Sequence, residues 1–175
     1  MHQATGSACD RRGGIAPRAC LRGLGRLCPR AISAGAGERD GEWCARYAAT
    51  VGAPDNAAVY FAVDADAGAA QIKKLVLPYF ASIDAAFKSL APNLRCGVYG
   101  SGAVCEAVMA AQLADFPWLS CSLGWSNSRA YFSSNKWVLR QHVPAIVAGI
   151  DCDPDDANGD FGDFAPFGPA SPASP

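Results

Sequence analysis

Long apolar runs are missing from this sequence, and so are closely spaced cysteine pairs and any large excess of one charge. No stretch approaches the about 18 apolar residues of a membrane-spanning helix, and arginine, glycine and proline interrupt the N-terminal region where a secretory signal needs a continuous apolar segment. Fifteen lysines and arginines balance 16 aspartates and glutamates, for a formal net charge of -1. We therefore expect no membrane span, no signal peptide and no whole-chain field that attracts nucleic acid.

The eight cysteines and two histidines form no recognisable metal or disulfide pattern. No C-x-x-C pair occurs, the cysteine spacings are irregular, and only His2 and His142 could supply imidazole ligands. Cys96, Cys121 and Cys152 each lie beside an apolar residue of a predicted strand, so we interpret them as small buried hydrophobic residues. The sequence predicts neither a metal site nor a cofactor.

The composition fits one domain with a basic segment in front of it. Of the 175 residues, 50% are apolar and 18% are charged, as in a compact globular domain. Residues 1–36 hold six arginines and one aspartate with no helical or strand period, so we predict a disordered, basic leader. The leader lacks the interleaved aromatic residues of a nucleic-acid-binding segment. Residues 37–167 form the predicted folded domain, and residues 168–175 form a Pro/Ser tail.

Apolar periodicity within the domain alternates between strand and helix patterns. A strand over residues 58–63 precedes a helical stripe over residues 72–90, in which Pro78 is expected to kink the helix or mark a later start. Further elements are predicted as helices over 41–51 and 103–114 and as strands over 95–99, 117–121, 136–142 and 146–152. The repeated β-turn-α order implies parallel strands, and the last connections are too short for long crossover helices. We expect an α/β domain with a strand-rich C-terminal half.

Two aspartates follow the first predicted strand. Because side chains two positions apart on a strand point to the same face, Asp64 and Asp66 are expected together on the face opposite Phe61. Functional sites of parallel sheets form at the carboxyl ends of the strands, where loops from several strands meet. The same spacing groups Asp151 with Asp153, so the sequence predicts four carboxylates at one edge of the sheet.

Spacing leaves two interpretations of these carboxylates open. Glycoside hydrolysis requires one protonated carboxyl group to assist the leaving oxygen and one ionised group as nucleophile, base or electrostatic stabiliser. Nearby aromatic residues, among them Tyr99, Trp118 and Trp125, would then provide platforms on which sugars stack. Aspartates after a strand also cap the next helix by accepting hydrogen bonds from its first amides. For Asp64 and Asp66, spacing alone favours capping.

Several short segments and their order add a family resemblance. They are Val59-Tyr-Phe-Ala-Val-Asp-Ala-Asp66, Gly97-Val-Tyr-Gly100, Gly124-Trp125, Leu139-Arg-Gln141 and Gly149-Ile-Asp-Cys-Asp-Pro-Asp155, followed by Asp160-Phe-Gly162. Together they resemble the bacterial glycoside hydrolase-like domains, which are distant relatives of the family-25 lysozyme-type muramidases. The resemblance covers residues 37–165. It implies a modified (β/α) TIM-like barrel whose last strands lack intervening helices.

The resemblance also implies roles for individual residues. Asp66 would be the proton donor and Asp64 its catalytic partner, although an Asp at the donor position is one methylene shorter than the Glu of the muramidases. The substrate-binding residues implied by the resemblance are Tyr99, Trp125, Gln141, Asp153 and Asp155. The matching segment has about half of the roughly 250 residues of a complete barrel, so we expect a partial barrel without its opening strands.

The function implied by the resemblance is hydrolysis of a bacterial cell-wall glycan, with a peptidoglycan-like carbohydrate as the partner and a secreted or cell-wall-associated location. Two alternatives remain open at this point. The domain could be a non-catalytic glycan-binding module that uses Trp and Tyr platforms, or an inactive gene remnant. Nucleic acid and membrane are not expected as partners.

Overall fold

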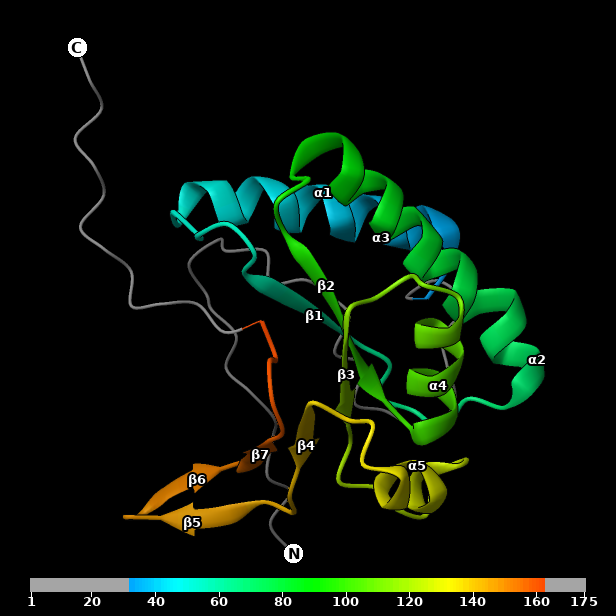
Figure 1. The fold of residues 1–175 in the computed structure, drawn as a ribbon, viewed down its shortest axis with the longest axis vertical. Helices are drawn as coiled ribbons and strands as arrows, with labels where there is room; N and C mark the ends of the chain where they lie inside the picture. The colour runs from blue at the N-terminus through cyan, green and yellow to red at the C-terminus, as the bar shows by residue number, and fades with distance from the viewer. Residues whose placement is uncertain (1–31, 163–175) are drawn as a thin grey trace, which may run out of the picture.

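Five strands form an open, mostly parallel sheet in the computed structural model, which describes residues 32–162 (Figure 1). The elements in chain order are α1 (Ala34–Thr50), β1 (Ala58–Ala62), α2 (Ala69–Gln71), the π-helix η1 (Ile72–Val76), α3 (Leu77–Leu90), β2 (Arg95–Gly100), α4 (Gly102–Ala110), β3 (Phe116–Leu119), α5 (Ser128–Ser134), β4 (Leu139–Gln141), β5 (Ala145–Val147), β6 (Ile150–Cys152) and β7 (Asp155–Ala157). The predicted α/β fold with mostly parallel strands is confirmed.

The strand order of the main sheet is β1-β2-β3-β4-β7. The first four strands are parallel, and β7 returns antiparallel to β4 with Gln141 opposite Asp155. Tyr60 pairs with Gly97, and Tyr99 pairs with Trp118, so aromatic side chains from three adjacent strands stand near one another. This register creates the aromatic surface of the candidate site described below.

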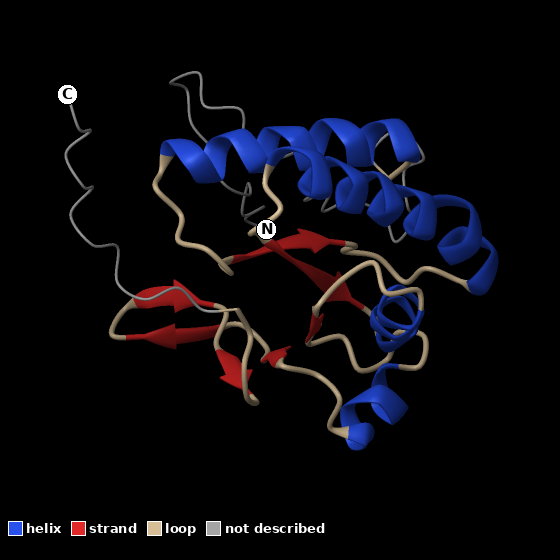
Figure 2. Cartoon of the chain, turned by 45° about the horizontal axis from the view of Figure 1, so that its top comes forward, coloured by secondary structure: helices blue, strands red, loops and turns tan. Residues whose placement is uncertain are grey.

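Helices cover the opposite face of the sheet. Phe61 of β1 is 2% exposed and packs edge-on against Tyr79 and Phe80 of α3, while α4 packs on β2 and β3. Figure 2 shows α1 and α3 side by side above the strands. A Cβ atom at Gly37 of α1 would overlap the backbone carbonyl of Tyr79. Glycine is therefore required where these two helices approach most closely.

The helical segment before β2 contains an irregular turn in front of Pro78. In η1 the amide of Leu77 donates to the carbonyl of Ile72, five residues earlier, and Pro78 occupies the first turn of α3. Proline has no N–H, so it is best tolerated at a helix start, and a π-turn before it lets the chain continue without a break. The prediction that Pro78 marks a later helix start is therefore wrong: the helical segment begins at Ala69 and runs on through Pro78, and the irregularity before the proline is the π-helix η1.

The C-terminal half differs from the prediction in three places, one of which is the strand β7, which was not predicted. The single strand predicted over residues 146–152 is wrong: Ala148 and Gly149 have φ of 52° and 82°, and this tight turn divides the segment into the hairpin β5–β6. Positive φ at both central residues matches the twist of a two-residue hairpin. The short helix α5 between β3 and β4 was not predicted; its seven residues are compatible with the expectation that this connection is too short for a long crossover helix.

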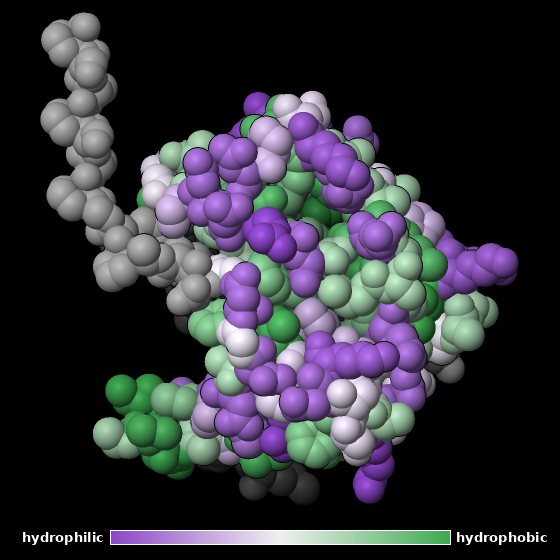
Figure 3. Space-filling model, viewed as in Figure 1, coloured by the Kyte–Doolittle hydropathy of each residue, from purple (hydrophilic) through white to green (hydrophobic). Residues whose placement is uncertain are grey.

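The hairpin is unusually apolar for its exposure. Ile146, Val147 and Ile150 are 73%, 55% and 66% exposed, and Figure 3 shows the hairpin as an apolar projection at the lower left of the molecule. Among the helices that the structure describes, none is long and apolar enough to cross a membrane.

The first helix begins earlier than predicted. α1 starts at Ala34, where the hydroxyl oxygen of Ser33 accepts a hydrogen bond from the amide of Ala36. Such an N-cap satisfies one of the free amides of the first turn. Residues 34–36, assigned to the irregular leader by the sequence, therefore belong to the helix. Residues 1–31 of that leader and the tail 168–175 lie outside the described residues.

Candidate functional site

A cavity of about 460 Å³ lies on the face of the sheet that the helices leave uncovered. It is lined by Tyr60, Ala62, Asp64, Tyr99, Trp118, Cys121, Ser122, Gln141, Pro144 and Asp153. Strand alternation explains the first three, because residues 60, 62 and 64 point away from Phe61 and the core. The predicted division of this strand into two faces is therefore confirmed up to Asp64.

Three aromatic rings form the floor of the cavity. The ring of Trp118 meets Tyr60 edge-on with centroids 5.5 Å apart and meets Tyr99 edge-on with centroids 5.0 Å apart. The Tyr60 hydroxyl donates to the carbonyl of Phe161 at 2.6 Å, and its ring lies against Gly97, which has no Cβ to displace it. Edge-to-face packing adds stabilisation beyond the buried area, so this floor is held in one arrangement.

Hydrogen bonds fix the polar groups around this floor. The Tyr99 hydroxyl donates to Oε1 of Gln141 at 2.7 Å, and the Trp118 indole Nε1 donates to Oδ1 of Asp155 at 2.7 Å. Asp155 is not part of the cavity lining. It holds Trp118 from β7, so in this structure its contact is with the indole.

The carboxylates influence the ionisation of their neighbours. Burial raises the pKa of Tyr99 above its ordinary value, and the negative charges of Asp64 and Asp153 raise it further. Burial also raises the pKa of Asp155, an effect opposed by its hydrogen bond from Trp118 and increased by the charge of Asp153. Tyr99 is therefore a neutral hydrogen-bond donor at neutral pH.

The structure separates the two carboxylates that the sequence paired. Asp64 is half-buried and lines the cavity, whereas Asp66 is exposed and lies outside the lining. Oδ1 of Asp66 accepts a hydrogen bond from the amide of Ser126 at 2.8 Å, which ties the loop after β1 to the segment before α5. Trp125, next to that amide, is half-buried and also outside the lining.

The second predicted pair of carboxylates is also divided. Asp153 lines the cavity together with Asp64, while Asp151 lies in the hairpin and lines a neighbouring hollow with Asp153. Of the four carboxylates expected at one edge of the sheet, only Asp64 and Asp153 line the cavity.

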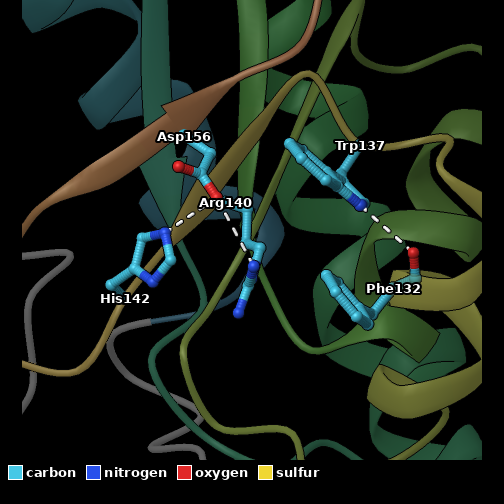
Figure 4. Close-up of polar contacts among 5 residues, drawn as sticks. All are labelled: Phe132, Trp137, Arg140, His142 and Asp156. Atoms are coloured by element: carbon cyan, nitrogen blue, oxygen red, sulfur yellow. Dashed lines mark hydrogen bonds and ion pairs between the residues drawn. The ribbon is translucent and has the colours of Figure 1, made fainter.

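A separate polar cluster beside the cavity joins Asp156 of β7 to Arg140 of β4 and to His142, which follows β4. Asp156 contacts Nε2 of His142 at 2.7 Å and Nη1 of Arg140 at 3.4 Å (Figure 4). The Arg140 guanidinium also lies over the Phe132 ring, 4.4 Å from its centroid. Arg140 and His142 therefore contact Asp156, and neither side chain is part of the cavity lining.

Sequence reasoning assigned too few residues to the site. Tyr60 was not among the predicted binding residues, although it lies on the same strand face as Asp64, and Trp118 was named only among the aromatic residues on which sugars would stack. Cys96 is buried as predicted, but Cys121 and Cys152 are half-buried, and Cys121 lines the cavity. A strict count of alternating strand positions identifies Tyr60. Cys121, Ser122 and Pro144 are loop residues without such a signal.

The chain shares its fold and sequence features with known bacterial proteins. The structure of the Tat-secreted protein Rv2525c of Mycobacterium tuberculosis, crystallised with L-tartrate, superposes with a TM-score of 0.60 at 21% identity, over 74% of this chain and 61% of that one. A second crystal form of the same protein, with HEPES, superposes with a TM-score of 0.57 at 20% identity, over 72% of this chain and 58% of that one. Both likenesses concern the fold.

A sequence relative is the uncharacterized protein YbfG of Bacillus subtilis (strain 168), 32% identical over 129 residues. The match covers 67% of this chain and 18% of that protein, so the chain spans only a part of its relatives. Residues 25–158 match the Rv2525c-like, glycoside hydrolase-like domain, which confirms the resemblance found in the sequence. The chain therefore belongs to the Rv2525c-like family of glycoside hydrolase-like domains.

Proposed function

We propose that the cavity on the open face of the sheet binds a glycan of the bacterial cell wall. One observation carries the proposal: Trp118, flanked by Tyr60 and Tyr99, forms an aromatic floor in the same cavity as the carboxylate of Asp64. Aromatic rings offer apolar faces to sugar C–H groups, and carboxylate and amide groups accept hydrogen bonds from sugar hydroxyls. Membership of a glycoside hydrolase-like family supports the same class of ligand.

Hydrolysis of that glycan is the second candidate, and the position of Asp64 favours it. Two carboxylates, Asp64 and Asp153, line one cavity, and a glycosidase needs two such groups around the bond it cleaves. The family resemblance assigns proton donation to Asp66. Its carboxylate accepts a hydrogen bond from Ser126 outside the cavity lining, so a donor role requires a different position of the loop after β1. Binding without turnover is therefore the function that this geometry supports best.

Retention on insoluble peptidoglycan tests the binding proposal. We expect Trp118→Ala to weaken retention about tenfold through loss of the central ring. Tyr47→Ala is the matched control, because Tyr47 is an aromatic residue on α1 that is 52% exposed. Equal retention of the wild type and Trp118→Ala would contradict the proposal, provided that both unfold cooperatively in a thermal melt.

Release of reducing ends separates binding from hydrolysis. If the chain is a hydrolase, Asp64→Asn abolishes release but keeps most of the retention, which the aromatic floor provides, and Asp66→Asn abolishes release at full retention if Asp66 donates the proton. The side-chain amide oxygen introduced by Asp66→Asn can still accept the Ser126 hydrogen bond, so the loop contact is kept. Retention on peptidoglycan without release of reducing ends identifies a non-catalytic module. A chain that is not retained, releases no reducing ends and does not melt cooperatively is an inactive remnant.

A further inference from the structure

The polar hydrogens of the aromatic floor are all used within the protein. The Tyr60 hydroxyl donates to a backbone carbonyl, and the Trp118 indole donates to Asp155. The Tyr99 hydroxyl donates to Oε1 of Gln141 at 2.7 Å. A phenol or an indole has a single polar hydrogen, so the three rings offer a ligand their apolar surfaces but no N–H or O–H.

Gln141 is the strongest hydrogen-bond donor that the lining keeps for a ligand. Its Oε1 accepts the Tyr99 proton, and between residues 32 and 162 its side chain makes no further hydrogen bond. Both hydrogens of a primary amide are on the nitrogen, so Nε2 retains two N–H groups in the cavity. Ser122 and Cys121 also line the cavity, but a hydroxyl accepts as readily as it donates and a thiol is a weak donor.

Tyr99 holds the Gln141 amide in one orientation. Burial, and to a smaller extent the charge of Asp64, raises the pKa of Tyr99, so its hydroxyl keeps the proton at neutral pH. Rotation of the amide by half a turn would exchange Oε1 and Nε2 and leave that proton without its acceptor. The hydrogen bond from Tyr99 therefore fixes which end of the amide a ligand meets.

The strand register places this amide at the end of the aromatic floor. Trp118 of β3 pairs with Tyr99 on one side and with Leu139 on the other. Gln141 comes two positions after Leu139 and therefore lies on the same face of β4, towards the carboxyl end of the strand. A sugar that stacks on the floor thus has the Gln141 amide beside it.

We propose that Gln141 determines the specificity of the cavity by donating a hydrogen bond from Nε2 to a carbonyl oxygen of the glycan, and that Tyr99 is the positioning residue for this donor. The inference rests on the proposed glycan binding and adds the group that is recognised, the uncharged amide of an acetamido substituent. A carbonyl oxygen only accepts, so it complements an N–H donor, and the acetamido methyl group packs on aromatic rings. A sugar without the carbonyl leaves the donor unpaired in the complex.

Two matched tetrasaccharides test the inference by calorimetric titration of the full chain. The β-1,4-linked tetramers of N-acetylglucosamine and of glucose share one backbone and differ in carrying an acetamido group or a hydroxyl group on each ring. We expect the N-acetylated tetramer to bind about tenfold more tightly. The ratio of the two dissociation constants is the readout, because damage to the aromatic floor weakens both tetramers alike.

Variants of Gln141 locate the preference. In Gln141→Glu one oxygen still accepts the Tyr99 hydrogen bond, but the second oxygen replaces Nε2, so we expect the preference to be lost. Gln141→Met removes the donor without adding a charge and should lower the ratio as well, which separates the lost donor from repulsion by a new carboxylate. Gln112→Glu makes the same chemical change at an exposed position after α4 and should leave the ratio unchanged.

A double-mutant cycle tests the positioning role of Tyr99. Tyr99→Phe removes the hydroxyl that orients the amide, so we expect the ratio to fall about threefold in the otherwise unchanged chain. The same substitution should not lower the ratio further in Gln141→Met, because no donor is left to orient. Equal losses of preference in both backgrounds would show that Tyr99 does not act through Gln141.

The inference and the proposed function fail in different ways. Equal affinity for the two tetramers, or a preference that survives in both Gln141 variants, would overturn the inference and leave glycan binding standing. Retention on peptidoglycan without binding of either tetramer would do the same. If neither tetramer binds and peptidoglycan is not retained by a chain that melts cooperatively, both the inference and the proposed function are wrong.

Discussion

The carboxylate of Asp155 on β7 holds the indole of Trp118 on β3 through a hydrogen bond of 2.7 Å. The two strands are not neighbours, since β4 lies between them in the sheet. The contact therefore connects the antiparallel last strand to the aromatic floor of the cavity. Through it, a residue outside the cavity fixes the orientation of the residue at the cavity's centre.

We expect Asp155→Ala to weaken glycan binding about fivefold, the equivalent of about 1 kcal/mol for one hydrogen bond. Binding weakens because the Trp118 ring can leave its orientation once the Asp155 carboxylate no longer accepts its hydrogen bond. Binding isotherms of the variant measure the effect, and a change in Trp fluorescence reports the altered ring environment. Asp156→Asn is the control, because it removes the negative charge that faces Arg140 and His142 but leaves Trp118 alone. Unchanged affinity in Asp155→Ala would refute the positioning role.

The Tyr60 ring requires glycine on the neighbouring strand. A Cβ atom at Gly97 would overlap the Tyr60 ring, so Gly97→Ala must displace the ring from the cavity floor. We expect a loss of about 2 kcal/mol of unfolding free energy, as for other overpacked sites, together with weaker glycan binding. Urea unfolding and binding isotherms check the two effects. Tyr60→Ala in the Gly97→Ala background should restore part of the stability, because it removes the ring that the new Cβ atom meets. If stability is not restored, the Tyr60 ring is not the cause of the loss.

Two glycines two residues apart on α1 are expected to behave oppositely. Gly37→Ala forces a methyl group into the Tyr79 carbonyl and should cost about 2 kcal/mol by separating α1 from α3. At Gly35 the nearest atom to an added Cβ is Nη1 of Arg39 at 3.8 Å, so Gly35→Ala should be neutral or raise stability by up to about 1 kcal/mol. Denaturant melts of both variants measure the difference. Equal changes in unfolding free energy for the two variants would mean that the contact between Gly37 and the Tyr79 carbonyl does not restrict the side chain at position 37.

Alkaline pH should destabilise the fold through its buried phenols. Burial is the largest cause of the raised pKa values of Tyr60, Tyr79, Tyr99 and Tyr131. The native state therefore holds these protons more tightly than the unfolded state, so their stabilising contribution is full below the ordinary tyrosine value of 10.0 and declines as the pH rises above it. Absorbance titration at the tyrosinate band should show a late step that coincides with loss of circular dichroism. Ionisation of all five tyrosines near pH 10 in a chain that remains folded would contradict this expectation.

Local periodicity was sufficient for the elements nearest the site. The alternation in β1 predicted that Phe61 would enter the core and that Asp64 would face the opposite side, and the structure shows both. The helical stripe predicted over residues 72–90 likewise includes Phe80 and Ile83, which are fully buried, although Leu90 at its end is 48% exposed. Such patterns are readable because the spacing of side chains along a strand or helix is set by backbone geometry.

Longer connections were less predictable. The hairpin β5–β6 depends on positive φ at Ala148, a conformation that alanine adopts rarely and that only the pairing of the flanking strands stabilises. Helix α5 begins after Asn127 and ends before Asn135, both left-handed, and its buried Ser128 accepts a hydrogen bond from the amide of Gly102 on α4. That contact joins residues 26 positions apart, so no local sequence pattern predicts it.

The sequence by itself determined the family, the parallel α/β plan and the face of β1 that carries Asp64, because each of these depends on short motifs or on the repeat distance of one element. Only the tertiary structure decided which polar residues meet. In the folded chain Asp153 lines the same cavity as Asp64, Asp66 accepts a hydrogen bond from the Ser126 amide, and Asp155 accepts one from the Trp118 indole. Those partners lie between 37 and 89 positions apart in the chain, and their contacts follow from strand register and loop paths that no single segment encodes.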